Sequence, residues 1–354
     1  MTKQEGLRVP ADKVLHLTKT ALERVGVPEG DAAAAAEVLV SADLQGIVTH
    51  GTRRLAPYIA RIRDGAFRSR AEIRIETPAP AVAVVDGGSG LGPVVGRKGL
   101  DLALKMAAES GIAFVTCRNS QHFGALAPYG RLAAGAGKVC LMGTNALATM
   151  APWGGREVRV GNNPFGLAAP RRNAPPFILD IAMSVAARGK MRLAQDRGEP
   201  IPPGWALDAR GRPTTDPLEG LKGFVLPIGG HKGYGLALMV DILAGVLSGG
   251  AVSTEVRSLF QQKTEPQRVS HFFIAIDPDR ILGRAAYEDR MEALCGLMKT
   301  TPPFDPGKPV LIPGEIEART HADRSANGIP MTADDLAALE ALARGEPPRK
   351  VSAF

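Results

Sequence analysis

The feature of this sequence that most limits its possible folds is a double change in hydrophobic periodicity. Near both ends, apolar residues recur at the three- and four-residue spacing of amphipathic helices, over residues 14–25, 31–42 and 332–344. From about residue 71 the pattern changes to short apolar runs typical of strands, separated by helical stretches, at residues 81–85, 112–117, 139–144, 177–181 and 272–276. Helical spacing returns at residues 287–298. This order predicts an α/β or α+β protein.

The length of the chain predicts two domains. Its 354 residues are more than one hydrophobic core usually organises. We predict a helical domain formed by residues 1–75 together with residues 286–354, and a sheet domain formed by residues 76–285. In this arrangement the two ends of the chain pack together.

Export, membrane insertion and nucleic-acid binding all lack support in the sequence. Residues 1–13 have no apolar core of a signal peptide, and the most apolar helical run, residues 236–247, is shorter than the roughly 20 residues of a membrane span, so we expect a buried core helix there. Cys117, Cys140 and Cys295 are widely spaced and form no CxxC, which fits a reducing cytoplasm. The net charge of +7 comes from scattered basic residues without aromatic partners, which favours small carboxylates over nucleic acid.

The first group of candidate functional residues is Thr49, His50 and Arg54, followed by Tyr58. Thr49 is a suitable N-cap, so we expect a helix to begin there. Positions 50, 54 and 58 are four apart, which predicts that imidazole, guanidinium and phenol share one face of that helix. A 2-oxo acid needs such a set, because a guanidinium fork binds a carboxylate and an acid protonates the carbonyl oxygen as hydride reaches the carbon.

The choice of proton donor stays open between two histidines. His50 at a helix start needs a carboxylate nearby to hold its charge, for which Asp43 and Asp180 are candidates. His122 lies on a loop directly after the strand at residues 112–117, where a rigid sheet usually holds binding groups. Capping or backbone hydrogen bonding would also account for either histidine alone.

Two glycine-rich segments are candidates for nucleotide phosphates. Residues 86–92 lie between a strand and a helix, but the last glycine of GxGxxG is replaced by Pro93 and the next strand ends in Arg118 instead of an acidic residue, so we interpret them as a glycine turn. Residues 229–235 open the apolar helix, where glycines, free N–H groups and Lys232 suit a pyrophosphate. This second segment is not a Walker A loop.

Taken together, these segments resemble those of the type 2 malate/L-lactate dehydrogenase family, which also includes sulfolactate and ureidoglycolate dehydrogenases and diketogulonate and cyclic-imine reductases. The similarity covers nearly the whole chain, and the order of its motifs is highly specific. It runs through Asp43-Leu44-Gln45-Gly46, Thr49-His50-Gly51, Arg54-Leu55, Val84-Val85-Asp86-Gly87, Gly90-Leu91-Gly92, Asn119-Ser120, His122-Phe123-Gly124, Ala151-Pro152-Trp153-Gly154-Gly155, Gly161-Asn162-Asn163-Pro164, Asp180-Ile181-Ala182-Met183-Ser184, Gly189-Lys190, Gly198-Glu199-Pro200-Ile201-Pro202, Gly204-Trp205-Ala206, Pro213-Thr214-Thr215-Asp216-Pro217, residues 230–235 and Pro313-Gly314-Glu315.

The resemblance implies a non-Rossmann fold with a mixed-sheet domain that binds NAD or NADP, and a homodimer. It implies that three segments hold the nucleotide: Asp180, Ile181, Ala182, Met183 and Ser184; His231, Lys232 and Gly233; and Pro313, Gly314 and Glu315. It further implies that His50 or His122 exchanges the proton and that Arg54 binds the substrate carboxylate. We therefore assign His50, His122, Arg54 and Asp180 to catalysis, and Arg54, Tyr58, Thr49 and Asn145 to substrate binding.

Four functional hypotheses follow, in decreasing order of support. The first is an oxidoreductase that moves a hydride between NAD or NADP and C2 of a small 2-hydroxy or 2-oxo acid. The second reduces cyclic imino acids or diketo sugar acids with the same hydride geometry. The third, a metal-dependent hydrolase or lyase, has no HxH or HExxH spacing behind it, so no metal site is predicted. The fourth is a nucleotide-binding regulator without turnover. Arg171 and Arg172 are candidates for contact with the 2′-phosphate of NADP.

Overall fold

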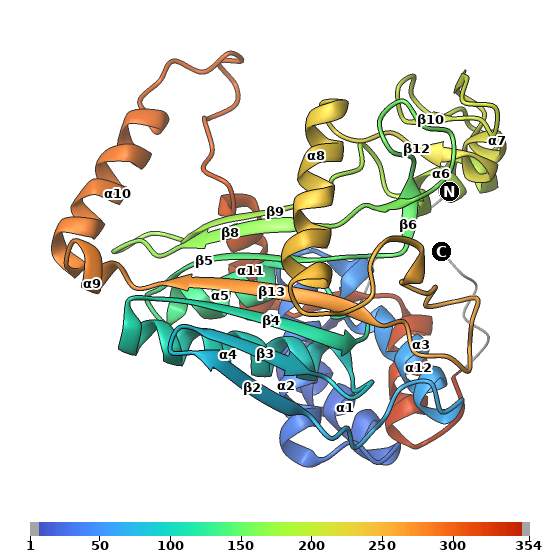
Figure 1. Ribbon diagram of the computed structural model, residues 1–354, viewed down its shortest axis with the longest axis horizontal. Helices are drawn as coiled ribbons and strands as arrows, with labels where there is room; N and C mark the ends of the chain where they lie inside the picture. The colour runs from blue at the N-terminus through green and yellow to red at the C-terminus, as the bar shows by residue number, and fades with distance from the viewer. Residues whose placement is uncertain (1–6, 349–354) are drawn as a thin grey trace.

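A seven-stranded mixed sheet forms the centre of the computed structural model, which describes residues 7–348 (Figure 1). In sheet order its strands are β2 (Arg74–Ala79), β3 (Val82–Asp86), β4 (Ile112–Ser120), β13 (Val269–Ile276), β5 (Val139–Thr144), β8 (Phe165–Ala169) and β9 (Phe177–Ile181). The β3–β4 pair is parallel, and the other neighbouring pairs in this sheet are antiparallel. Each strand expected from the sequence is present, and the α/β prediction is confirmed.

Helices cover both faces of this sheet. On one face, α4 (Gly92–Ser110) and α5 (Ala127–Gly135) pack on inward-facing apolar residues that include Val85, Val115 and Phe273. On the other face, α8 (His231–Val240) runs into a π-helical turn, Asp241–Val246, and places Val240 and Ala244 on Phe272. Because Phe272 and Phe273 are adjacent on β13, they point to opposite faces, which lets this central strand contribute to both layers.

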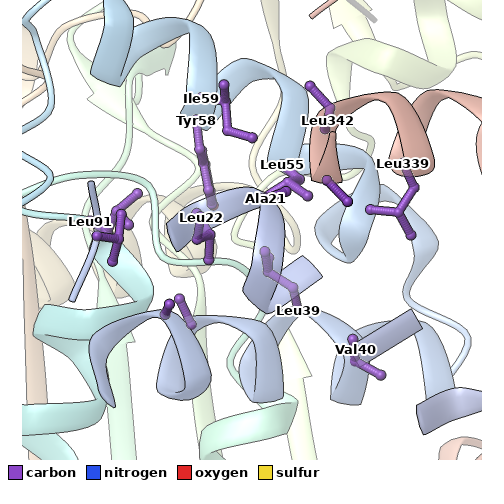
Figure 2. Packing of buried hydrophobic residues seen from close by; sticks show 14 of the residues in the cluster. Ala21, Leu22, Leu39, Val40, Leu55, Tyr58, Ile59, Leu91, Leu339 and Leu342 are labelled. Carbon is purple, nitrogen blue, oxygen red and sulfur yellow. The ribbon is translucent and has the colours of Figure 1, made fainter. Parts of the chain in front are cut away.

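The two ends of the described chain meet in a helical layer that contacts α4 and α5 through α2. It contains α1 (Ala11–Arg24), α2 (Glu29–Leu44), α3 (Leu55–Arg63), α11 (Glu315–Asn327) and α12 (Ala333–Ala343). Leu22, Leu39, Leu55 and Leu342 share one buried cluster, which Figure 2 shows. The short strands β1 (Leu7–Val9) and β14 (Ile329–Met331) pair antiparallel beside it. The contact between α1 and α12 confirms that both termini build this layer, while the domain boundaries remain a prediction.

Two smaller parts extend from the sheet. One contains β6 (Ala148–Met150), β7 (Val160–Gly161), α6 (Arg188–Arg197), β10 (Ala206–Leu207), β11 (Pro213–Thr214), α7 (Pro217–Lys222) and β12 (Phe224–Val225), around a small core that includes Met183 and Met191. The other contains α9 (Pro278–Ile281) and α10 (Arg284–Lys299), beside the turn between β8 and β9 (Figure 1). Arg171 in that turn pairs with Glu292 of α10 at 2.6 Å.

The expectation of one continuous helix from Thr49 is wrong. Two 3-10 turns, Val48–His50 and Thr52–Arg54, precede α3, which begins at Leu55. The Asp43 carboxylate accepts hydrogen bonds from the N–H and the hydroxyl of Thr52, at 2.9 and 2.6 Å, and so bends the chain between the two turns. Pro57 lacks an N–H and its ring would clash with a carbonyl four residues back in a continuous helix. His50 and Arg54 therefore do not share one helix face.

The expectation of a buried helix over residues 236–247 is also wrong. Ile242, Val246 and Leu247 are 51%, 57% and 54% exposed, because only the opposite side of this helix packs on the sheet. Among residues 7–348, no helix is long and apolar enough to cross a membrane.

Candidate active site

Two histidines from distant parts of the chain meet at the boundary between the helical layer and the sheet. His50 ends the first 3-10 turn, and His122 follows directly after β4. Their rings are stacked, with centroids 5.5 Å apart and an interplanar angle of 26°. The two alternative proton donors of the sequence analysis thus lie in one site.

Buried partners fix the orientation of His122. The hydroxyl of Tyr58 lies 2.7 Å from its Nδ1, and its backbone N–H donates to Oε1 of Gln267 at 3.0 Å. Burial raises the pKa of Tyr58 well above its usual value, so the phenol keeps its proton and donates it to Nδ1. Neutral His122 then carries its own proton on Nε2.

Both histidines are neutral at neutral pH in this structure. Burial, and secondly the charge of Arg54, lower the pKa of His50 to about 4. Burial and Arg54 likewise hold the pKa of His122 well below its usual value. The Nδ1 of His50 lies 2.9 Å from the hydroxyl of Thr49. A substrate that offsets the charge of Arg54 would therefore raise both pKa values.

Arg54 is oriented by the chain around it. Its Nε donates to the carbonyl of Thr49 at 2.6 Å, and its guanidinium lies 5.8 Å from the ring centre of Phe260. Burial lowers its pKa, and within residues 7–348 it forms no salt bridge. The outer pair of guanidinium nitrogens is the part suited to a carboxylate.

These residues border a small cleft of about 290 Å³, called here the arginine cleft. Its polar and charged lining consists of His50, Arg54, His122, Thr144, Asn145, Thr149, Asn162, Ser184, Arg188, Ser258 and Gln267. A second cleft of about 550 Å³, called here the β9 cleft, lies between the end of β9 and the start of α11. Both clefts are bordered by His50, Gly124, Asn162, Pro164 and Ala187, so they adjoin.

The residues expected to hold a nucleotide fall into three groups. Asp180, Ala182, Pro313 and Gly314 border the β9 cleft, and Ser184 borders the arginine cleft. The Met183 side chain is fully buried in the small core and Ile181 packs against that core, while buried Glu315 accepts a hydrogen bond from Lys299 at 2.6 Å. His231, Lys232 and Gly233 begin α8 and border neither cleft.

The start of α8 is nevertheless tied to the segment that borders both clefts. The N–H of Ile228 donates to the carbonyl of Met183, and the N–H of Val185 donates to the carbonyl of Leu226, both at 2.8 Å. Gly229 and Gly230 have positive φ values of 56° and 64°, which glycine adopts without strain.

The two carboxylates considered as partners of His50 are hydrogen-bonded elsewhere. Asp43 binds Thr52, and Oδ2 of Asp180 accepts the N–H groups of Leu126 and Ala127 at 2.9 Å each. Within residues 7–348, neither carboxylate forms a hydrogen bond with His50. Asp180 therefore anchors the start of α5 on β9.

The remaining substrate candidates also have partners within the protein. Tyr58 is buried and reaches the arginine cleft only through His122. Thr49 contacts His50 beside the cleft. Asn145 borders the cleft, but its amide donates to the carbonyl of Ala251 at 2.7 Å and accepts from the N–H of Ser270 at 2.8 Å.

Several cleft residues were not expected from the sequence, and Gln267 and Arg188 are the two that contribute an identified contact or a charge. Gln267 holds the His122 loop, and Arg188 at the start of α6 adds a second guanidinium to the arginine cleft. Gln267 lies in a polar loop without periodicity or motif. Arg188 directly precedes the Gly189-Lys190 motif, which was the one available signal.

The glycine turn at residues 86–92 holds the His122 loop closely. A Cβ on Gly92 would lie 2.3 Å from the carbonyl oxygen of His122 and 2.4 Å from that of Gln121. These are backbone atoms, so a side chain at this position forces the loop to move. The close contact between Gly92 and the His122 loop is a packing contact within the chain, as expected for a glycine turn.

We expect Gly92→Ala to lower the free energy of unfolding by about 1–3 kcal/mol, because a methyl group is forced into a filled space. Urea denaturation measures this change. Gly30→Ala is the control: Gly30 lies in α2 with open space at the Cβ position, so the change there should be within about 1 kcal/mol. Equal stability of the Gly92 variant and the unmodified protein would contradict the packing argument.

Two further expectations concern the 2′-phosphate of NADP and a metal ion. Arg171 and Arg172, considered for a 2′-phosphate, pair with Glu292, Glu288 and Asp289 of α10. Within residues 7–348, no group of three or more His, Cys, Asp or Glu side chains is arranged to hold a metal ion.

Comparisons with known proteins agree with this architecture. The profile of the family described as malate/L-lactate dehydrogenase matches residues 9–340. Malate dehydrogenase of Pyrococcus horikoshii is 37% identical over 346 residues, which cover 96% of this chain and 95% of the relative. A (2R)-3-sulfolactate dehydrogenase (NADP(+)) of Chromohalobacter salexigens is 41% identical over 280 residues, covering 78% of this chain and 83% of the relative.

Comparison with a solved structure shows that the whole fold of this chain is similar to that of a relative. The sulfolactate dehydrogenase of Methanocaldococcus jannaschii superimposes with a TM-score of 0.89 at 36% sequence identity, covering 96% of this chain and 97% of that chain. The chain therefore belongs to the malate/L-lactate dehydrogenase family and is an NAD(P)-dependent dehydrogenase of the 2-hydroxy acid class.

Proposed function

We propose that this dehydrogenase transfers hydride where its two clefts adjoin, with the 2-oxo or 2-hydroxy acid in the arginine cleft and the nicotinamide nucleotide in the β9 cleft. The observation that carries the proposal is that His50 borders both clefts. A proton-exchanging group at this boundary lies beside the carbon that gains or loses hydride, which is the placement that the reaction requires.

The β9 cleft suits a nucleotide in size and in backbone groups. Its volume of about 550 Å³ is typical of small-molecule sites. Helix α11 begins at its wall after Gly314 without a side-chain cap, which leaves backbone N–H groups there, while Glu317 of its first turn also borders the cleft and disfavours an anion close to it. Asp180, Ala182, Pro313 and Gly314 would hold the nucleotide there. The start of α8 with Lys232 borders neither cleft, so it would bind the pyrophosphate only where the nucleotide extends out of the β9 cleft. When bound, the nucleotide supplies or accepts the hydride.

The residues of the arginine cleft would bind the substrate carboxylate, exchange the proton and hold the C2 oxygen. Arg54, held at Nε by Thr49, presents its outer nitrogens to the C1 carboxylate. His50 gives a proton to the C2 oxygen during reduction and takes it back during oxidation. His122, with its proton on Nε2, donates a hydrogen bond to the same oxygen. The balanced reaction is 2-oxo acid + NAD(P)H + H⁺ → 2-hydroxy acid + NAD(P)⁺.

Substrate binding would itself prepare His50 for this role. The charge of Arg54 is one of the two causes of the low pKa of His50. A carboxylate bound to Arg54 offsets that charge and moves the pKa of His50 towards its usual value. The proton would thus be taken up together with the 2-oxo acid, while the neutral histidine of the free enzyme is ready to act as a base.

We further propose that the enzyme is a cytoplasmic homodimer. Apolar side chains lie exposed on α10, where Leu294 and Leu297 are 55% and 65% accessible, and on the π-helical turn that follows α8. Exposed apolar groups of this extent are typical of surfaces that another chain covers. A second copy is the natural occupant, since most soluble oligomers are symmetric assemblies of one chain.

The placement of the nucleotide can be tested by thermal unfolding with NADH and NADPH. At a hundredfold excess over the dissociation constant, the preferred nucleotide should stabilise the protein by about 2.7 kcal/mol. Ala182→Leu, inside the β9 cleft, should remove this stabilisation. Val185→Leu, on an exposed position of the same segment, should keep it. Full stabilisation of the Ala182 variant would place the nucleotide elsewhere. Loss of NADH or NADPH absorbance with a panel of 2-oxo acids then reports turnover.

A further inference from the structure

His271 is a buried histidine that the proposed chemistry does not use. It lies on β13, the strand between β4 and β5, and it is fully buried. Burial lowers its pKa to about 3, so the ring is neutral and carries one N–H. Both ring nitrogens have a partner: Nε2 lies 2.7 Å from the hydroxyl of Ser120 at the end of β4, and Nδ1 lies 2.8 Å from the hydroxyl of Thr144 at the end of β5.

The distances around His271 assign the hydrogens of this chain of polar groups. Within residues 7–348, the other acceptor of the Ser120 hydroxyl is the carbonyl of Gln121 at 3.5 Å, which is long for an O–H···O bond. Ser120 therefore donates to Nε2, and the N–H at Nδ1 donates to Thr144. The Thr144 hydroxyl in turn donates to the carbonyl of Ser270, 3.0 Å away. The chain is complete only with a side chain that accepts at one end and donates at the other.

The same ring contacts the loop that carries His122 on both sides of that residue. Ser120 precedes His122 by two positions, and the ring of Phe123, which follows it, is stacked on His271 with centroids 4.0 Å apart and an interplanar angle of 6°. On the other side of His271, Thr144 borders the arginine cleft. His271 thus joins the His122 loop to the β5 side of the cleft.

From this arrangement we infer that His271 is a positioning residue of the reaction, which holds His122 at the distance from the β5 side of the arginine cleft that hydride transfer needs. The inference rests on the proposed function, in which His122 donates a hydrogen bond to the C2 oxygen. Tyr58 orients the ring of His122 and Gln267 holds its backbone, whereas His271 holds the residues before and after it. His271 borders neither cleft, so it acts through this loop.

The first test measures single-turnover hydride transfer to a 2-oxo acid. His271→Phe keeps a flat ring beside Phe123 but loses both nitrogens, and it should slow the transfer about 10- to 100-fold, because a displacement of about 1 Å at the reacting groups costs that much. KM and nucleotide affinity should change less than about threefold, since Arg54 and the β9 cleft carry the binding. His271→Gln places an amide near the position of Nε2 and should recover part of the rate.

Phe272→Leu is the matched control for a loss of stability alone. Phe272 is the next residue of β13, is fully buried and packs on the opposite face of the sheet. This variant should unfold at lower urea concentration and keep the rate of hydride transfer. An unchanged rate in His271→Phe, or a loss that appears in KM with kcat unchanged, overturns the inference.

A double-mutant cycle with Ser120 tests the contact itself. Ser120→Ala should slow hydride transfer about three- to tenfold alone, and it should add nothing in the His271→Phe protein, because both changes break the same hydrogen bond. Should His271→Phe fail to fold, His271→Gln takes its place in the cycle. Losses that multiply would show that the effect does not pass through Ser120, which overturns the inference.

The last test needs no turnover and therefore separates this inference from the proposed function. Heteronuclear NMR of histidine-labelled protein should find the ring signals of His122 shifted or broadened in Ser120→Ala, a variant that keeps the ring at position 271. The signals of exposed His16 should not change, and neither should those of His122 in Phe272→Leu. Shifted His122 signals in a protein that reduces no 2-oxo acid would reject the proposed function while supporting the positioning of His122 by His271. Unchanged His122 signals overturn the inference whatever the rates.

Discussion

Replacing His50 by alanine is expected to slow hydride transfer about 10²- to 10⁴-fold while nucleotide affinity stays close to that of the unmodified enzyme, because general acid–base catalysis contributes a factor of this size. His50→Gln should be equally slow, since an amide forms hydrogen bonds but delivers no proton at neutral pH. Single-turnover measurements with saturating nucleotide separate the chemical step from binding. The position of His50 at the boundary of both clefts is the reason for this expectation.

His122 provides the matched comparison. It borders only the arginine cleft, and its Nδ1 is occupied by Tyr58, so we expect it to orient the substrate oxygen. Full activity in His50→Ala together with a collapse in His122→Ala would exchange the two roles. The pH dependence gives an independent check: reduction requires protonated His50 and should weaken as pH rises through its pKa in the complex, whereas oxidation requires the neutral ring and should strengthen.

Arg54→Ala is expected to lower kcat/KM about 10²- to 10⁴-fold, since hydrogen bonds to a charged group contribute about 1.5–3 kcal/mol each and a bidentate carboxylate makes two. Arg54→Lys should recover only part of this loss, because the charge is kept but the planar fork is not. Steady-state kinetics with one 2-oxo acid measure both variants. Unchanged KM and kcat in Arg54→Ala would exclude the carboxylate role.

A second readout of Arg54 requires no substrate. The guanidinium charge lowers the pKa of His50, so in Arg54→Ala an NMR titration should find the His50 pKa above its value of about 4 in the unmodified protein. Arg53→Ala is the control, because Arg53 is exposed and pairs with Asp335 at 3.0 Å on the other side of the turn. This variant should change neither kinetics nor the titration.

The strands were the most predictable part of the fold. Residues 139–144 and 177–181 are apolar runs bounded by turn-forming residues, and they became β5 and β9 with unchanged limits. A buried strand can be predicted from such a local pattern alone. The course of the chain from Thr49 to Arg54 was not predictable in this way, because it depends on a hydrogen bond to Asp43 in the preceding helix.

The sequence predicted which residues form the candidate site better than it predicted their hydrogen-bond partners. The motifs shared with the family identified His50, His122 and Arg54 as candidates, and all three border one cleft in the structure. The partners of these residues were not visible, since Tyr58 reaches His122 across 64 positions and Gln267 reaches it across 145. Contacts of that separation are set by packing of the sheet on the helices, which periodicity does not encode.

The pairing of β1 with β14 has a consequence for the time order of folding. Leu7 is opposite Met331, so this ladder and the contact between α1 and α12 form only after nearly the whole chain has left the ribosome. At about 5–20 residues per second, that delay is on the order of 15–65 s. During synthesis, the apolar sides of α1 and α2 that later contact the C-terminal helices therefore stay exposed to solvent while the central sheet assembles. In this interval the chain is most in need of a chaperone.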